Sequence, residues 1–227
     1  MAVKPWTTVV EKTVPSSFEP SPKDSLAPDA SLDLEYVYGY RCHDVRNNLY
    51  YLADGRIVFH TAAVGIVMDT KKNTQQFFFG HKDDILAIAL HPDGKTVATG
   101  EIGPTPLICV WDTTTMQQIT SFNSPLKKGV QHLAFSESGN QLAAVAMDDE
   151  HNVAVWDWNK SDKKSGVKGI LKASGKGTRA KILSLAWVPG AAENMLVTTA
   201  VKEVKFFTVS AGTIKPKTGI GMDKIAE

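Results

Sequence analysis

The stretch His91-Pro92-Asp93-Gly94, followed by Val110-Trp111-Asp112, recurs further along the chain. A second turn sequence, Ser136-Glu137-Ser138-Gly139, is followed by Val155-Trp156-Asp157, and both landmarks are displaced by the same 45 residues. A period of this length, in which each copy ends on a Trp-Asp pair, is typical of the blades of a WD-repeat β-propeller. A β-sandwich or a barrel predicts no such fixed period. The sequence therefore predicts an all-β WD-repeat propeller.

Weaker copies of the same pattern lie on both sides of these two. Met68-Asp69 stands where Trp-Asp is expected in the first copy, and Phe207-Thr208 stands there in the last. Short strands of alternating polarity, separated by turns, fill the region with almost no helical pattern. In the two clearest copies they are expected at residues 85–90, 96–100, 107–111, 118–122, 130–135, 141–146 and 153–158. About four blades are therefore predicted, which is an incomplete ring.

The chain divides into six expected segments. These are a Pro-rich extended or disordered tail (1–31), a leader with a degenerate first blade (32–79), a WD blade (80–123), a WD blade with a basic segment (124–172), a degenerate blade (173–211) and a connector (212–227). Prolines in the tail favour extended backbone, because proline lacks an N–H and disfavours helix. A partial ring leaves open blade edges, so we expect further blades or a partner to cover them.

Composition and length bound the class of protein. The 227 residues are 43% hydrophobic and 22% charged, as in an ordinary globular protein. No run of about 18 apolar residues is present, and residues 1–10 carry no apolar signal core, so neither a membrane partner nor secretion is expected. Cys42 and Cys109 lack metal-type spacing and suit a reducing compartment such as the cytosol. A net charge of +1 gives no reason to expect a nucleic acid partner.

Positive charge is concentrated in one segment. Residues 159–181 carry a net charge of +7, and the rest of the chain carries −6. The eight basic residues of this segment are the candidate partner-binding residues Lys160, Lys163, Lys164, Lys168, Lys172, Lys176, Arg179 and Lys181. Two interpretations remain open. The segment is either a solvated loop or a contact for an acidic polymer, because clustered charge steers association over about 8–10 Å.

Six residues of the two clear blades are interpreted as structural. An indole ring buries roughly 150–250 Å², which favours a core position for the Trp of each Trp-Asp pair. In WD-repeat proteins this Trp often shares hydrogen bonds with a His, a Ser or Thr, and a turn Asp. Both sets are incomplete here, because residues 101–107 hold no Asp and the second clear blade has no matching His. The structural residues are His81, Thr99, Trp111, Asp112, Trp156 and Asp157.

No catalytic, cofactor-binding or metal-binding residue is assigned. The six histidines are scattered, and Cys42-His43-Asp44 is the only tight cluster of potential ligands, whereas zinc normally takes four. The chain has no Gly-x-Ser-x-Gly nucleophile elbow and no complete phosphate-binding loop. We therefore expect neither enzymatic activity nor a cofactor.

The segment Leu34-Glu35-Tyr36-Val37-Tyr38-Gly39-Tyr40-Arg41, followed by Arg46-Asn47-Asn48-Leu49-Tyr50-Tyr51, is far more specific than a Trp-Asp pair. It resembles the later part of the HELP motif of the echinoderm microtubule-associated protein-like family, which makes residues 32–79 a HELP-like segment joined to the first blade. The resemblance continues through Phe79-Gly80-His81-Lys82-Asp83-Asp84-Ile85 and Val204-Lys205-Phe206-Phe207-Thr208. It covers roughly residues 33–221.

This resemblance implies a non-enzymatic, microtubule-associated WD-repeat scaffold that binds or stabilises microtubules. The implied partners are tubulin and other cytoskeletal or axonemal proteins, and the implied locations are the cytoplasm, the cytoskeleton and the ciliary axoneme. Acidic tubulin tails favour the basic segment as a contact. The earlier half of the HELP motif, the second propeller and the coiled coil of the family are not found in this sequence. The alternative is a general adaptor propeller in a signalling or ubiquitin-ligase complex, because fold does not determine function.

Overall fold

The computed structural model describes residues 7–19, 21–22, 26, 30–161 and 168–220. The chain forms two compact units, residues 1–35 and 36–227, which are described separately below. Among the described residues, no helix has the length and apolar character that crossing a membrane requires.

The first unit contains one short helix, α1 (Thr7–Thr13), which buries none of its side chains. The expectation of an extended or disordered tail is wrong for these seven residues. Their stretch is free of proline, and the helix ends before Pro15, as expected from the restriction that proline places on the preceding residue. The Thr13 hydroxyl donates to the Val10 carbonyl (2.8 Å) within the last turn.

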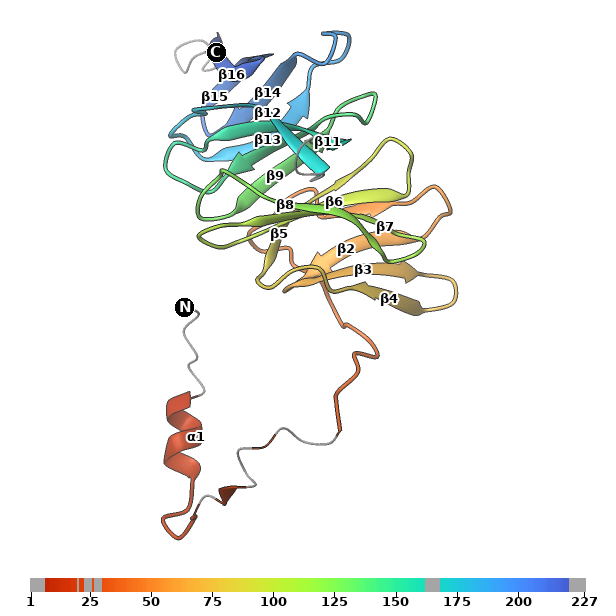
Figure 1. Cartoon of the computed structure of the whole chain (residues 1–227), viewed down its shortest axis with the longest axis vertical. Helices are drawn as coiled ribbons and strands as arrows, with labels where there is room; N and C mark the ends of the chain where they lie inside the picture. The colour runs from red at the N-terminus through yellow and green to blue at the C-terminus, as the bar shows by residue number, and fades with distance from the viewer. Residues whose placement is uncertain (1–6, 20, 23–25, 27–29, 162–167, 221–227) are drawn as a thin grey trace. The chain divides into compact units, whose positions relative to one another are not determined.

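The second unit consists of antiparallel four-stranded blades (Figure 1). The first blade contains β1 (Leu49–Tyr51), β2 (Ile57–Thr61), β3 (Val64–Asp69) and β4 (Thr74–Phe78) in that spatial order. The second blade contains β5 (Ile85–Leu90), β6 (Thr96–Glu101), β7 (Leu107–Asp112) and β8 (Gln118–Asn123), again in sequence order. The first strand of each blade is the inner one, since β5 packs against β9 of the next blade.

The third and fourth blades share one eight-stranded sheet. The third blade contains β9 (Val130–Phe135), β10 (Leu142–Ala146), β11 (Val153–Ser161) and β12 (Lys168–Gly175). The fourth blade contains β13 (Ile182–Trp187), β14 (Met195–Ala200), β15 (Glu203–Ser210) and β16 (Gly212–Ile220). The outer strands β12 and β16 pair in parallel through Ala173 with Gly212 and Ser174 with Thr213, which joins the two blades at their outer edges.

The connector expected over residues 212–227 is wrong for residues 212–220, which form β16. Gly212 has a φ of 79°, a conformation that glycine adopts readily and that allows the chain to reverse directly after Ser210. Ile214 of β16 is then buried in the core between the third and fourth blades. Residues 221–227 lie outside the described part of the chain.

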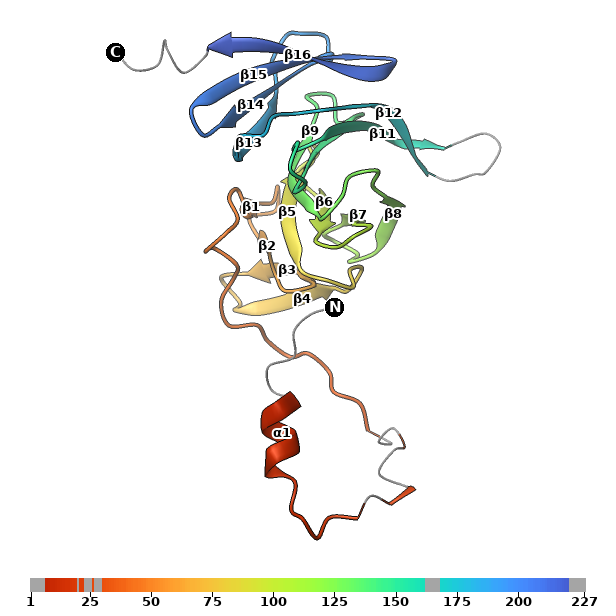
Figure 2. The same cartoon turned by 90° about the vertical axis from the view of Figure 1, so that its left-hand side faces the viewer.

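The blades follow one another along the second unit (Figure 2), and the hydrophobic core lies in layers between consecutive blades. Val58 and Phe78 of the first blade pack with Trp111 of the second, and the rings of Phe78 and Trp111 stack at 4.6 Å with an interplanar angle of 7°. Two further layers join the second blade to the third and the third blade to the fourth. Each blade is thus stabilised mainly by its neighbours, as in other repeat proteins. The predicted all-β propeller is confirmed.

Strand pairing reproduces the 45-residue period of the sequence. Ile88 of β5 pairs with Thr99 of β6, and Leu133 of β9 pairs with Ala144 of β10 at the same offset. Trp111 of β7 and Trp156 of β11 therefore occupy equivalent positions in the repeat, and these residues are 0% and 1% exposed.

Candidate functional site

A strap, defined as residues 36–48, crosses the first blade before the chain enters β1. The Tyr36 hydroxyl donates to Asn73 Oδ1 (2.7 Å). The backbone N–H of Val37 donates to Gln75 Oε1 (2.8 Å), and Gln75 Nε2 donates back to the Val37 carbonyl (3.1 Å). One side-chain amide thus replaces the paired backbone bonds of a fifth strand, so the strap is held to β4 without forming a strand.

Arg41 joins this strap to the second blade. Its guanidinium contacts Asp44 of the strap at 2.6 Å and Asp84, directly before β5, at 2.7 Å. The hydrogen bond from Arg41 holds the pKa of Asp44 below its usual range. Asn48 donates from its side chain to the Arg41 carbonyl, which fixes the backbone around this ion pair.

The Cys42-His43-Asp44 triplet lies in the same strap. Asp44 is committed to Arg41, and the His43 ring is 76% exposed. Cys42 is exposed and free. Within the described ranges, no group of three or more potential metal ligands comes together.

The second blade contains a buried hydrogen-bonded set of four side chains. Trp111 Nε1–H donates to Thr99 Oγ1 (3.1 Å), and Thr99 Oγ1 lies 2.7 Å from His81 Nε2. His81 Nδ1 lies 2.9 Å from Glu101 Oε2. One arrangement of protons satisfies the whole set: His81 donates from Nδ1 to Glu101 and accepts the Thr99 hydroxyl proton at Nε2. Burial lowers the pKa of His81, and the Glu101 carboxylate opposes that shift.

Glu101 is the acidic member that sequence analysis missed. Residues 101–107 hold no Asp, and the acidic member of the set is a glutamate, the last residue of β6. Glu101 also accepts from the backbone N–H groups of Lys82 (3.1 Å) and Leu107 (3.2 Å). Side chains two residues apart on a strand lie on the same face, so Thr99 and Glu101 share one face of β6. This spacing is the sequence signal that could have identified Glu101.

The third blade has an apolar set at the same four positions. Leu126, Ala144 and Ala146 stand where His81, Thr99 and Glu101 stand in the second blade, and all three are buried in one cluster with Trp156. The Trp156 ring packs against Phe122 of the second blade with ring centroids 5.4 Å apart.

The aspartates of the two Trp-Asp pairs differ as well. Asp112 accepts at Oδ1 from the backbone N–H groups of Thr114 (2.7 Å) and Thr115 (2.9 Å), so it stabilises the turn between β7 and β8. Asp157 instead pairs with the exposed Lys160 at 2.9 Å.

The third blade has two ends, and the basic segment is divided between them. The connections β9–β10 and β11–β12 lie at one end, here called the hairpin end. The connections β10–β11 and β12–β13 lie at the other, here called the loop end. Because β12 spans about 25 Å at the usual rise per residue, residues before and after it are far apart.

Lys160 and Lys168 lie at the hairpin end, where β11 and β12 extend outward beyond β9 and β10 (Figure 2). Lys168 is exposed and pairs with Ser161 of β11. Lys163 and Lys164 lie outside the described residues. Lys172, within β12, donates from Nζ to Gln141 Oε1 (3.0 Å).

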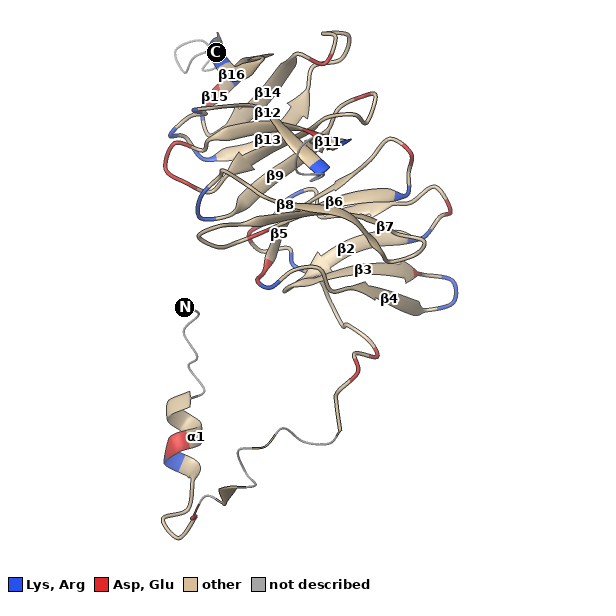
Figure 3. Ribbon diagram, viewed as in Figure 1, with Lys and Arg blue, Asp and Glu red and all other residues tan. Residues whose placement is uncertain are grey.

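Lys176, Arg179 and Lys181 lie at the loop end. Glu150 contacts Arg179 at 3.1 Å and Lys176 at 4.0 Å, so one carboxylate offsets part of their charge. Lys181 lines a cavity together with the strap. Basic and acidic residues are interspersed along the blades (Figure 3). The eight basic residues therefore do not form a single patch.

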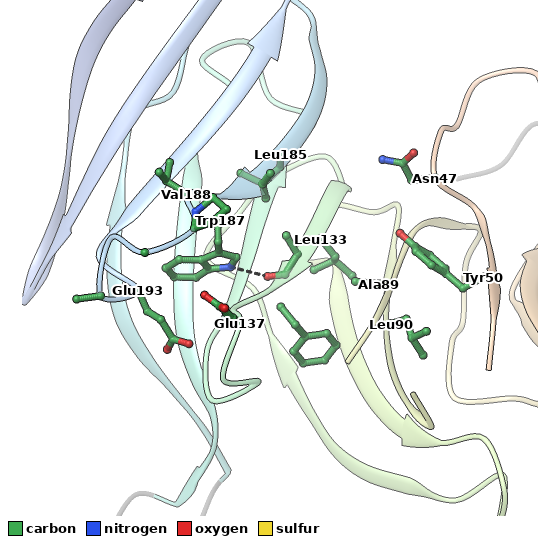
Figure 4. A pocket seen from close by; sticks show the side chains of 16 residues that line it. Asn47, Tyr50, Ala89, Leu90, Leu133, Glu137, Leu185, Trp187, Val188 and Glu193 are labelled. Carbon is green, nitrogen blue, oxygen red and sulfur yellow. Dashed lines mark hydrogen bonds between the residues drawn. The ribbon is translucent and has the colours of Figure 1, made fainter. Parts of the chain in front are cut away.

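The concave side of the blades contains a larger cavity of about 680 Å³ at the hairpin end (Figure 4). All four blades or their connections contribute to its lining, with Asn47 and Tyr50 on one side and Trp187 and Glu193 on the other. Trp187 Nε1–H donates to the Ala134 carbonyl (3.0 Å), which fixes the indole ring. Sequence analysis did not identify this site, because its residues are scattered over nearly 150 positions.

Comparison with known protein families accounts for both the strap and the blades. The HELP motif matches residues 27–66, which include the strap, and the family described as echinoderm microtubule-associated protein first beta-propeller matches residues 74–226.

Similar curated proteins belong to the same family. The chain is 31% identical to human echinoderm microtubule-associated protein-like 1, over 96% of this chain and 27% of that protein. It is 32% identical to human echinoderm microtubule-associated protein-like 2, over 87% of this chain and 32% of the relative. It is also 32% identical to the 77 kDa echinoderm microtubule-associated protein of Strongylocentrotus purpuratus, over 86% of this chain and 28% of that protein.

The chain spans less than a third of the length of these relatives. The expected family resemblance is nevertheless confirmed, because the propeller match alone covers more than half of the chain. The protein belongs to the echinoderm microtubule-associated protein-like family, with a HELP motif that leads into the family's first β-propeller.

Proposed function

We propose that this protein is a non-enzymatic, microtubule-associated WD-repeat scaffold that binds or stabilises microtubules. The observation that carries the proposal is the match of residues 74–226 to the first propeller of a family named for microtubule association. Tubulin is the proposed principal partner, and other cytoskeletal proteins are further partners. The proposed location is the cytoplasm and its cytoskeleton.

The contact with tubulin is assigned to the hairpin end of the third blade. Lys168 is exposed there, and Lys163 and Lys164 lie close to it in sequence. At the loop end, by contrast, Glu150 already pairs with Lys176 and Arg179. Acidic protein tails would be attracted to these lysines, and the attraction would weaken with salt.

Co-sedimentation with microtubules tests the proposal. The Lys163→Glu/Lys164→Glu/Lys168→Glu variant is expected to bind about tenfold more weakly at low salt, since three charge contacts with a partner contribute roughly 0.5 kcal/mol each. The difference from wild type should shrink as salt is raised. Lys71→Glu/Lys72→Glu, at the corresponding hairpin of the first blade, is a control that reverses two lysine charges, and it should bind like wild type.

Two outcomes would contradict these assignments. Wild-type protein that stays in the supernatant at low salt would overturn the microtubule proposal itself. An equal loss in the control variant would place the contact in the general charge of the protein instead of the hairpin of the third blade.

A finer proposal concerns the array and the exposed first blade. We place the protein on stable microtubule arrays such as the ciliary axoneme, with axonemal partners. Imaging of the tagged protein tests this, and its absence from cilia would contradict the proposal. Tyr38 and Tyr51 are 91% and 73% exposed on the first blade. Further blades or a partner would cover such an apolar edge, and protection of this blade from hydrogen exchange on microtubules would support that.

A further inference from the structure

The concave cavity has the dimensions of a ligand site. Its volume of about 680 Å³ lies within the usual range of roughly 300–1,000 Å³ for binding pockets. Aromatic and aliphatic side chains form its walls, namely Tyr50, Leu133, Phe135 and Trp187. The Trp187 ring is fixed by its hydrogen bond to Ala134, so this wall is present before any ligand arrives.

The charge of the cavity has one sign. Among the described residues, its lining contains two carboxylates, Glu137 and Glu193, and no Lys, Arg or His. The Glu137 side chain is exposed and forms no hydrogen bond or ion pair with any described residue. Its oxygens are therefore free to accept from a ligand.

Glu193 is held in place by the neighbouring blade. Its Oε1 accepts from the backbone N–H of Ser138 (2.6 Å), and its Oε2 lies 3.5 Å from Gln141 Nε2. Burial raises the pKa of Glu193, but the hydrogen bonds from Ser138 and Ser136 and the positive charge of Lys172 together outweigh it and keep the pKa below its usual value. Trp187, Glu137 and Glu193 lie along one side of the cavity (Figure 4).

We infer that this cavity binds the side chain of an arginine from an extended segment of a protein partner. A guanidinium is planar, so it stacks on an indole or a phenyl ring, and it donates two parallel hydrogen bonds to a carboxylate. Trp187 and Glu137 offer these two features on one side of the same cavity. A lysine ammonium would match only the charge.

This site goes beyond the microtubule proposal and is independent of it. The proposed microtubule contact uses lysines to attract acidic tails, whereas the cavity uses carboxylates to attract a cation. Both lie at the hairpin end, so one propeller would present two surfaces of opposite charge preference to different partner segments.

A matched pair of peptides tests the inference. Acetyl-Gly-Ala-Arg-Ala-Gly-amide and the same peptide with citrulline, a neutral analogue of similar shape, are titrated into the ¹⁵N-labelled chain. The indole N–H signal of Trp187, assigned by its loss in Trp187→Phe, is expected to shift saturably. The arginine peptide should bind about tenfold more tightly than the citrulline peptide.

Two substitutions locate the charge that is responsible. Glu137→Gln should weaken binding of the arginine peptide about tenfold, and Glu137→Lys should abolish it. Glu137 is exposed and unpaired among the described residues, so both variants should keep the wild-type melting temperature. Asp149→Asn is the control, because Asp149 is 90% exposed at the loop end and contacts only Lys128.

The inference is overturned if the two peptides bind equally, if the Trp187 signal does not move, or if Glu137→Gln binds like wild type. Microtubule co-sedimentation of Glu137→Gln should equal that of wild type. A parallel loss of both activities would mean that the cavity and the hairpin act as one site, and it would also overturn the assignment of a separate arginine site.

Discussion

The second and third blades solve the same packing problem in different ways. Each buries a tryptophan of its third strand, and the two residues lie 45 positions apart and are 0% and 1% exposed. In the second blade Trp111 is the end of a hydrogen-bonded set that reaches Glu101. In the third blade Trp156 lies among alanine and leucine side chains.

The difference shows that the tryptophan, and not its polar partners, is the shared requirement. A buried polar set is stable only when every member has a partner, because an unpaired donor or acceptor costs more than its hydrogen bond contributes. An apolar set has no such dependence. The two blades should therefore respond alike to loss of the tryptophan and differently to loss of a polar partner.

Loss of the indole should have the largest effect. Trp111→Ala and Trp156→Ala are each expected to lower the free energy of unfolding by about 3–5 kcal/mol through the cavity left behind. Trp111→Ala should lie at the upper end, because it also removes the stacking on Phe78. Urea unfolding measures both, and Tyr51→Ala, on an exposed edge, is the control. A cost below about 1 kcal/mol for either would show that its layer is not a core.

The second largest effect on stability should come from acid, through a buried histidine whose ring forms no hydrogen bond. His60 of the first blade is fully buried, both of its ring nitrogens lack hydrogen-bond partners, and burial lowers its pKa to about 4. The unfolded chain therefore binds this proton more readily than the folded chain. Stability from neutral His60 is complete above about pH 6.5 and is lost as the pH falls towards 4, by up to about 3 kcal/mol.

Unfolding curves between pH 7 and pH 4 measure this loss. His60→Leu should flatten the pH dependence, whereas His43→Gln, at an exposed histidine, should leave it unchanged. A slope that is the same in His60→Leu and wild type would assign the acid sensitivity to other groups, among them His81 and His132, whose pKa values burial also lowers.

Removing one polar partner from the second blade should cost less than removing the indole. Glu101→Ala leaves His81 and the backbone N–H groups of Lys82 and Leu107 without their acceptor, and the expected cost is about 1–3 kcal/mol. Thermal unfolding measures it, with Asp149→Ala as the exposed acidic control. Equal stability of the two variants would mean that the hydrogen-bonded set contributes nothing net.

The smallest further effect should come from replacing the rest of the set together with Glu101. His81→Leu/Thr99→Ala/Glu101→Ala gives the second blade the side chains of the third. It removes the His81 and Thr99 donors along with the Glu101 acceptor, but it leaves the Trp111 indole N–H and the backbone N–H groups of Lys82 and Leu107 without an acceptor. We therefore expect a cost close to the roughly 1–3 kcal/mol of Glu101→Ala alone, within about 1 kcal/mol of it. Unfolding of the single and triple variants side by side measures this. Additive losses would show that the polar set is required by its surroundings.

The period in the sequence was sufficient for the inner blades. Strands at 85–90 and 130–135 were expected and are present, because a fixed repeat and alternating polarity both report local strand geometry. The helix at Thr7–Thr13 and the strand at Gly212–Ile220 were not foreseen. The prolines of the tail and the glycines after residue 211 favour irregular structure when taken from the sequence alone. In the structure, however, Gly212 with its positive φ is what allows β16 to form.

Candidate sites were less predictable than strands. The eight basic residues look continuous in sequence, but β12 carries its chain back across the blade and separates Lys168 from Lys176. The role of Glu101 as a hydrogen-bond acceptor was not predicted, because it depends on the positions of His81 and of two backbone N–H groups in space. Of the eight, only the lysines assigned to the hairpin end stay a proposed contact, which co-sedimentation tests.

The sequence by itself determined the blade period, the buried tryptophans, the HELP-motif segment and the family, because these depend on residue type and spacing along the chain. Only the tertiary structure decided which charges are compensated, which polar set is complete, and that Glu137 and Trp187 line one cavity. The physical reason is that hydrogen bonds and ion pairs act over a few ångströms in space. They join residues that a linear pattern leaves 50 or more positions apart.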